Sequence, residues 1–189
     1  TRRSDKSSLN SITNTIVEEF VSSKKIKGKF EIGQALSSPF NLESNEGGAS
    51  ITIDNRVLYY TKCIRNKKGY NNCDIYYVNR EGNAWSEVQN FSDKISKSDS
   101  WESQPTVSSD GKTIIFASDR SGGYGKIDLY EINWQNGKWT DPKNLGSAIN
   151  SNEHEKSPYL HTDGKTLFFS STNFPSLGGF DIFYSRMDS

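Results

Sequence analysis

The chain has 189 residues with 23 basic and 23 acidic side chains, so its formal net charge at pH 7 is zero. This balance excludes the net positive charge that draws a protein to nucleic acid or to an anionic membrane surface. Only 32% of the residues are hydrophobic and the apolar runs are short, so the sequence predicts no membrane span. Tyr, Phe and Trp together make up 12% of the chain, which indicates a folded, strand-rich protein rather than a disordered one.

The N-terminal stretch fits two structures. Leu9, Ile12 and Ile16 fall near helical spacing, whereas the β-branched Val17 and Val21 favour a strand. The repeat described below favours the strand, at residues 19–21, followed by a turn at 24–28 and a strand at 30–36. Because the sequence starts without a methionine and shows no signal peptide, we interpret it as a processed or excised piece.

Three landmarks recur along the chain at intervals of 53 to 56 residues. The first is a two-residue hairpin turn, Asp-Gly or Asp-Asn, and the second is an aspartate that precedes a β-rich run. The third is an aromatic residue that opens a further strand. A fixed period of this length is the signature of a repeat architecture. The landmarks are Asp54, Asp110 and Asp163; Asp74, Asp128 and Asp181; and Phe30, Trp85 and Trp139.

Each repeat is predicted to contain four short antiparallel strands, the arrangement of a β-propeller blade. In the first unit these are residues 49–53, 56–62, 74–79 and 85–91, and the second unit repeats them over 104–145. The third unit starts at 157, reaches a strand at 181–186 and lacks a fourth strand. The second strands are apolar throughout (VLYYTK, TIIFAS, TLFFSS), as expected for strands packed on both faces.

The predicted fold is therefore all-β, a partial β-propeller that forms a single domain over 1–189. It divides into outer strands of a preceding blade (1–45), two blades (46–91 and 102–145) and an incomplete blade (155–189). A β-sandwich or a β-helix is the alternative. So few blades make an open arc, or a ring completed by chain not included here, and we expect a protein neighbour on the exposed blade face.

The two cysteines flank a polar loop between two predicted strands. Cys63 ends one strand and Cys73 immediately precedes the next, so a disulfide would join the two ends of a hairpin. Two free thiols are the alternative, and the spacing does not match a CxxC metal site. The disulfide is the favoured interpretation, and it indicates an oxidising compartment.

The segment DGKTIIFASDRSGGYGKIDLY, with ESQP before it and WTDPKNLGSAIN after it, resembles the PD40 repeat, a WD40-like and TolB-like propeller unit. WESQPTVSSDGKTIIFASDR, EKSPYLHTDGKTLFFSS and YYTKC…NNCDIYY are similar to the propeller segment of envelope lipoproteins of gliding and protein-secreting Gram-negative bacteria. That group commonly joins TPR, PD40 and OmpA-like peptidoglycan-binding regions and is associated with type IX secretion and gliding. The resemblance covers residues 19 to 186, and no TPR or OmpA-like segment is present.

Repeated acidic residues are expected to be structural rather than catalytic. Asp74, Asp128 and Asp181 share one slot, and a residue present in every blade is usually a turn or strand-entry hydrogen-bond acceptor. Glu46, Glu102 and Glu155 form a second set, each close before a hairpin turn. A ring of carboxylates can hold a cation, but we favour hydrogen bonds to backbone or to a basic residue of the adjacent blade.

No motif for catalysis or for a cofactor is found. His154 and His161 have no further ligand at metal-binding spacing, and the glycines of SGGYG are not followed by a lysine and a helix start. No G-x-S-x-G, Walker or H-E-x-x-H sequence occurs. We therefore predict no catalytic, cofactor or metal site.

Loop residues supply the candidate interaction sites. Trp101 is an aromatic residue in a polar connection, where it either anchors a partner or packs between two blades. Arg120, Tyr124 and the repeated Glu102 and Glu155 complete the candidate set.

The sequence predicts a non-enzymatic scaffold of the bacterial periplasm, associated with the outer membrane through its parent protein and part of a type IX secretion or gliding complex. Its expected partners are other envelope proteins, and peptidoglycan through domains outside this chain. The alternatives are a glycan- or peptidoglycan-associated binding module, with Trp101 and Tyr124 as stacking platforms, and a propeller-fold hydrolase.

Overall fold

The structure is a computed structural model that describes residues 2–3, 18–42, 44–65, 71–92, 94–175 and 178–187. Within these ranges the chain forms strands and turns and no helix, so the all-β prediction is confirmed. The strand expected at 19–21 is found as two short strands on either side of Phe20. Leu9, Ile12 and Ile16, whose spacing made a helix the alternative, and Val17, which favoured the strand, lie outside the described residues.

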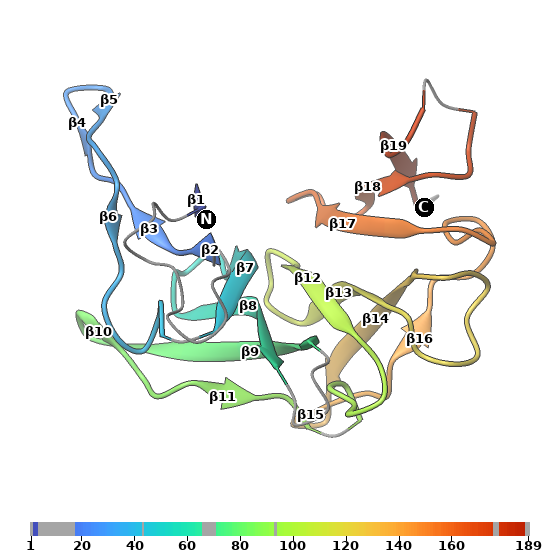
Figure 1. Cartoon of the computed structure of the whole chain (residues 1–189), viewed down its shortest axis with the longest axis horizontal. Coiled ribbons are helices and arrows are strands. Elements are labelled where there is room, and N and C mark those ends of the chain that lie inside the picture. Colours follow the sequence, from blue (N-terminus) through green and yellow to red (C-terminus); the bar gives the residue numbers. More distant parts are fainter. Residues whose placement is uncertain are drawn as a thin grey trace.

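The sheets follow one another around an open arc, from the N-terminal strands to the C-terminal sheet (Figure 1). We call them the half-blade and the first, second and third blades. The half-blade contains β1 (Arg2–Arg3), β2 (Glu18–Glu19), β3 (Val21–Ser22), β4 (Lys25–Ile26), β5 (Lys29–Phe30) and β6 (Gln34–Ala35). The first blade contains β7 (Asn45–Ile51), β8 (Val57–Arg65), β9 (Asn71–Glu81), β10 (Ala84–Trp85) and β11 (Gln89–Asn90). The second contains β12 (Glu102–Val107), β13 (Thr113–Ser118), β14 (Asp128–Gln135), β15 (Lys138–Trp139) and β16 (Lys143–Asn144). The third contains β17 (Glu155–Leu160), β18 (Thr166–Ser171) and β19 (Asp181–Arg186).

Strand pairing repeats in register from blade to blade. Each blade is antiparallel and meandering, with the order β7-β8-β9-β10 in the first and β12-β13-β14-β15 in the second. Tyr130 pairs with Asn144 in the second blade, and the residues 54 positions earlier, Tyr76 and Asn90, pair in the first. The sequence period therefore corresponds to one blade.

The outermost strand of each complete blade is split, although the sequence predicts one strand there. In the first blade the Ser86 hydroxyl accepts a hydrogen bond from the Asn79 backbone N–H at 3.0 Å, and Thr140 does the same for Asn133 in the second. Because a side chain takes the place of a backbone acceptor, the ladder is interrupted between β10 and β11 and between β15 and β16. Pro142 also lacks the N–H that a continuous strand would use.

The hydrophobic core lies between the blades rather than within one sheet. Ile114 and Phe116 of β13 pack toward the first blade, against Tyr59 and Ile75, while Ile115 of the same strand packs toward the third. Strand β13 is thus buried on both faces, as its unbroken apolar sequence predicts. A third cluster joins the half-blade to the first blade and contains Phe20, Phe40, Tyr60 and Val78.

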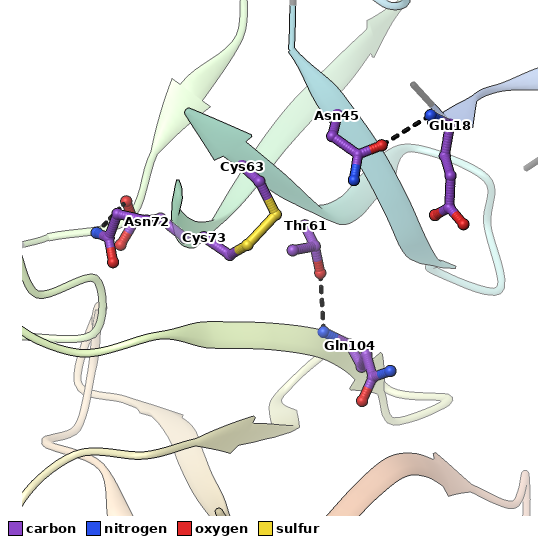
Figure 2. The surroundings of a disulfide bond; sticks show 8 residues. Glu18, Asn45, Thr61, Cys63, Asn72, Cys73 and Gln104 are labelled. Atoms are coloured by element: carbon purple, nitrogen blue, oxygen red, sulfur yellow. Dashed lines mark hydrogen bonds between the residues drawn. A yellow bond between two sulfur atoms is a disulfide. The ribbon is translucent and has the colours of Figure 1, made fainter. Parts of the chain in front are cut away.

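A bulge with a left-handed residue recurs in the innermost strand of every blade. The residue two positions after each repeated glutamate has a positive φ: 56° at Gly48, 55° at Gln104 and 51° at Ser157. At this bulge the blades are joined by hydrogen bonds. The Gln104 N–H donates to the Thr61 hydroxyl at 2.8 Å (Figure 2), and the Ser157 N–H donates to the Gln104 side-chain oxygen at 2.9 Å. The bulge therefore helps to dock the second blade on the first and the third blade on the second.

The predicted disulfide is present. Cys63 of β8 and Cys73 of β9 are directly opposite each other in the antiparallel pair and are bonded (Figure 2). The sequence predicts Cys63 at the end of one strand and Cys73 just before the next, whereas both lie inside the ladder, which continues through Ile64–Asn72 and Arg65–Asn71.

The third blade exposes the face that the first and second blades bury. Tyr159, Ile182 and Tyr184 are 53%, 81% and 70% exposed, whereas the corresponding face of β13 is covered by the third blade. This is the exposed apolar face expected of an open arc.

Candidate protein-interaction face

Each blade begins with its innermost strand, such as β12 or β17, and continues with a second strand, such as β13 or β18. At one end of the blades, the loops that precede the innermost strands meet the loops that follow the second strands. The loop at 119–127 reaches from the second blade to the third, where the Lys126 N–H donates to the Glu153 carbonyl at 2.8 Å. The Glu155 N–H in turn donates to the Ile127 carbonyl at 2.8 Å. We call the surface formed by residues 95–101, 119–127, 150–154 and 172–180, apart from the undescribed 176–177, the loop face.

The repeated glutamates lie beneath the loop face and are fully buried. In Glu46 and Glu102 one carboxylate oxygen accepts the backbone N–H five residues earlier, at 3.0 Å in both blades, and the other accepts a serine hydroxyl two residues earlier. Glu155 binds the N–H and hydroxyl of Ser151 at 2.8 and 2.6 Å. Each carboxylate therefore holds together the loop that leads into its own blade. A buried charge is stable only when it is hydrogen-bonded, and these bonds meet that condition.

Glu102 has a cationic partner in Arg120, which belongs to the same blade. The Arg120 guanidinium is 3.2 Å from the Glu102 carboxylate, and its Nη2 also donates to the Ile95 carbonyl of the connection from the first blade at 2.7 Å. The guanidinium carbon lies 5.2 and 5.1 Å from the ring centroids of Phe116 and Tyr130. Arg120 is thus held by a carboxylate, a carbonyl and two aromatic rings.

Glu102, Glu155 and Arg120 were also candidate interaction residues, but their side chains are buried. The favoured interpretation of the glutamates, hydrogen bonds to backbone, is confirmed, while the basic residue on Glu102 comes from its own blade and not from the adjacent one. A charged side chain is favoured in such a place only when it is paired. The structure assigns all three to holding the loop face together, and the partner-contacting surface must be sought in other residues.

Asp74, in the first blade, lies near the buried carboxylate of Glu102. Burial, with a smaller contribution from the charge of Glu102, raises the pKa of Asp74 to about 6, and the Asn72 amide, which donates at 3.2 Å, opposes the rise. The other carboxylate oxygen of Asp74 is buried and has no hydrogen-bond partner. The protonated form of Asp74 is therefore favoured by its surroundings.

Asp128, in the same repeated slot, has a structural function. Its carboxylate accepts the Tyr124 and Gly125 N–H groups and, at 2.6 Å, the Asn144 amide. It shapes the glycine-rich loop so that Gly125 lies against the third blade, where a Cβ would come within 2.6 Å of the Glu153 carbonyl. Gly125 thus allows close approach of two blades. Asp181, third in the set, begins β19.

Trp101 both packs between blades and contributes to the surface. Its ring lies against the cluster between the second and third blades, and it is partly buried. The Lys156 ammonium lies 5.2 Å from the Trp101 ring centroid and 5.5 Å from that of Phe180. An aromatic–cation–aromatic row therefore crosses from the second blade to the third.

Tyr124 and Phe180 are the exposed aromatic residues of this face. They are 56% and 47% exposed, and they come from equivalent loops of the second and third blades. Sequence reasoning found Tyr124 but missed Phe180 and Lys156. Phe180 directly precedes Asp181, as Ile127 precedes Asp128, so a comparison of repeats at that slot would have shown an added aromatic ring.

Neither histidine has a site around it. His154 lies 6.2 Å from Phe180, ring to ring, and His161 hydrogen-bonds the Asp163 backbone N–H in the third hairpin turn. No group of three or more His, Cys, Asp or Glu side chains in the described ranges is placed to hold a metal ion.

The three turn aspartates, Asp54, Asp110 and Asp163, each accept the backbone N–H two residues later.

Comparison with known proteins identifies the fold. No protein-family model and no curated protein matches the chain. Among solved structures it is similar to TolB from Acinetobacter baumannii, with a TM-score of 0.52 and 20% identity over 82% of this chain and 32% of that one. It is also similar to a TolB-like protein from Agrobacterium tumefaciens, with a TM-score of 0.50 and 15% identity over 88% of this chain and 61% of that one.

A third similar structure is a chain of a nidogen–laminin complex, with a TM-score of 0.55 and 13% identity over 89% of this chain and 54% of that one. At these identities the likeness concerns the fold, which is that of a TolB-like β-propeller. The chain spans less than two thirds of each of these structures. In its described part, no helix is long and apolar enough to cross a membrane.

Proposed function

We propose that this chain is a non-enzymatic protein-interaction module that binds its partner through the loop face. The observation that carries the proposal is the row of Trp101, Lys156 and Phe180. Tyr124, on the loop of the second blade that is equivalent to the loop of Phe180, is a further exposed aromatic residue. Exposed aromatic rings and a cation on a rigid support are typical of residues that anchor protein partners. The buried glutamates and Arg120 provide that support.

The compartment proposed is the bacterial envelope. A bonded Cys63–Cys73 pair persists in the periplasm and outside the cell, where thiols are oxidised. The repeat motifs resemble those of envelope lipoproteins associated with type IX secretion and gliding. This resemblance supports a place in such a complex, at the periplasmic side of the outer membrane through the parent protein.

Affinity isolation of the native, full-length protein from gently solubilised envelopes tests the proposal. We expect membrane-anchored envelope proteins to be recovered with the wild type and to be lost from a Tyr124→Ala/Phe180→Ala variant. Both side chains are exposed, so the variant should keep its fold, which thermal unfolding would check. Recovery of the same proteins with the wild type and with the double variant would refute the loop face as the binding surface.

A glycan-binding module is the second candidate, and one groove favours it. Between the first and second blades lies a groove of about 400 Å³, whose walls carry aromatic rings and polar groups. Trp134 in this wall is 44% exposed. Pockets of this size with aromatic walls and a few polar groups suit small ligands. The lining includes Tyr77, Trp134, Trp139, Asn79, Asp110 and Lys112. Calorimetric titration with peptidoglycan fragments would detect such binding, and hydrolysis of the fragments would indicate a hydrolase instead.

A further inference from the structure

The half-blade carries a β-hairpin at residues 24–32 that is equivalent in position to an outer hairpin of each complete blade. Lys25 pairs with Phe30 in β4–β5, as Arg80 pairs with Trp85 in β9–β10. Both pairs place a cation over an aromatic ring, at 5.5 and 5.6 Å. The hairpin of the second blade, at 133–141, has the same register. The three hairpins can therefore be compared residue by residue.

The charge of the half-blade hairpin differs from that of the other two. Residues 24–32 (KKIKGKFEI) contain four lysines and one glutamate, a formal charge of +3, in a chain with no net charge. The equivalent segments, 79–87 (NREGNAWSE) and 133–141 (NWQNGKWTD), carry −1 and 0. All four lysines are exposed. The repeat does not require this charge, because the other blades form the same hairpin without it.

Two isoleucines replace polar residues in the same hairpin. Ile26 and Ile32 are 50% and 90% exposed, at positions where the first blade has the exposed Glu81 and Glu87. The core therefore does not explain them, since their positions face solvent in the complete blades. Phe30 does not distinguish this hairpin from the other two, because the equivalent residues of the complete blades, Trp85 and Trp139, are aromatic residues that pack against the blade. The second blade has Gln135 and Asp141 at the two isoleucine positions.

We infer that this hairpin is a contact site for an anionic phospholipid surface, a function separate from the loop face. The hairpin projects away from the arc (Figure 1) and so can reach a planar surface without the blades intervening. Clusters of four or more lysines bind anionic headgroups, and apolar side chains among them enter the boundary between headgroups and acyl chains.

The arrangement of side chains favours a lipid surface over an acidic protein. Lys25 and Phe30 share one side of the hairpin, while Ile26 and Lys29 share the other, so each side carries a cation and an apolar group. Lysine stems lie along apolar surroundings while their ammonium groups stay at the phosphates. A bilayer interface accepts this mixture on both sides of the hairpin, whereas an acidic protein surface would leave the isoleucines exposed.

Vesicle co-sedimentation with the disulfide-intact chain tests the inference. The probes are vesicles of phosphatidylcholine alone and of phosphatidylcholine with phosphatidylglycerol. We expect partitioning onto the anionic vesicles only, weakened by salt. The variant K24Q/K25Q/K27Q/K29Q should lower the partition coefficient by about tenfold or more. The variant I26S/I32S should lower it several-fold and make the remaining binding fully reversible by salt. The matched control, R80Q/K138Q in the equivalent hairpins, should leave it unchanged.

Three outcomes would overturn the inference. The first is equal binding to neutral and anionic vesicles, or none to either. The second is an equal loss in the control variant, which would mean that general charge rather than this hairpin is responsible. The third is displacement by soluble polyglutamate with no effect of the isoleucine substitutions, which would indicate an acidic protein partner. Thermal unfolding of each variant would separate a lost contact from a lost fold.

Discussion

Arg120 and Glu102 form an ion pair of 3.2 Å in which the Arg120 side chain is 7% exposed and the Glu102 side chain fully buried. The carboxylates at the equivalent positions, Glu46 and Glu155, are bound by backbone and serine groups. Among the described residues, the second blade thus adds a guanidinium where Glu46 and Glu155 are held by neutral donors. Because Arg120 also binds the Ile95 carbonyl, the pair ties the second blade to the connection that precedes it.

Arg120→Met should lower the free energy of unfolding by about 3 kcal/mol, because it leaves a buried carboxylate with fewer partners. Denaturant unfolding followed by tryptophan fluorescence measures the loss. Lys126→Met, which breaks the exposed pair with Glu153, is the control and should change stability by less than about 1 kcal/mol. Equal effects of the two substitutions would show that the buried pair contributes no more to stability than the exposed one.

Asp74 should contribute a fall in stability as the pH rises from about 4 to about 6. Its pKa in the folded protein is about 6, above its ordinary value of 3.8, so the folded state binds more protons than the unfolded state in this window. The stabilisation is present below the window and lost above it. Asp74→Asn should remove this part of the pH dependence and raise stability at pH 7 by about 1 kcal/mol, a figure reduced for solvent screening. Unfolding curves across the pH range check this, and a parallel pH dependence in both proteins would refute it.

Removing the disulfide should destabilise the protein without changing its fold. Cys63→Ala/Cys73→Ala opens a bond that spans ten residues of sequence, for which the loss of chain constraint is about 2–3 kcal/mol. Guanidinium unfolding gives the difference. A reductant should lower the stability of the wild type by a similar amount and have no effect on the double variant. A reductant effect on both would assign the change to another cause.

Gly125→Ala should loosen the contact between the second and third blades. A Cβ there would lie 2.6 Å from the Glu153 carbonyl and 2.8 Å from the Asn152 carbonyl carbon, and backbone cannot yield as a side chain does. We expect a loss of about 2 kcal/mol or more. Gly137→Ala is the control: its φ is +77° but no atom lies within 4 Å, so about 1 kcal/mol is expected. Hydrogen exchange should show the loss of protection in β17 for the first variant only.

The sequence predicts the blades well because their landmarks are local. A turn aspartate such as Asp110, and an apolar strand such as 113–118, depend on backbone geometry and burial that repeat in each unit. The disulfide was also predictable, since Cys63 and Cys73 flank one polar hairpin loop in the sequence and pair directly across its two strands. The split outer strands were not, because Ser86 gives no sign in the sequence that its hydroxyl replaces a ladder acceptor.

The candidate site was only partly predictable, because it depends on contacts between blades. Glu102 and Arg120 look like surface residues in a polar loop, but the folded loop at 95–101 and the rings of Phe116 and Tyr130 bury them. The left-handed backbone at Gln104 and Ser157 was not predictable, because neither position is a glycine. Phe180 and Lys156 become a surface feature only when β17 and the loop before β19 meet beside Trp101.

Site-specific photo-crosslinking tests the central claim most directly. A photoreactive residue would replace Tyr124, Phe180 or, as the control on an outer hairpin, Lys138, in the full-length protein in its native envelope. The loop-face proposal predicts protein adducts at positions 124 and 180 and none at 138. Adducts at position 138 alone, or at none of the three positions, would contradict it.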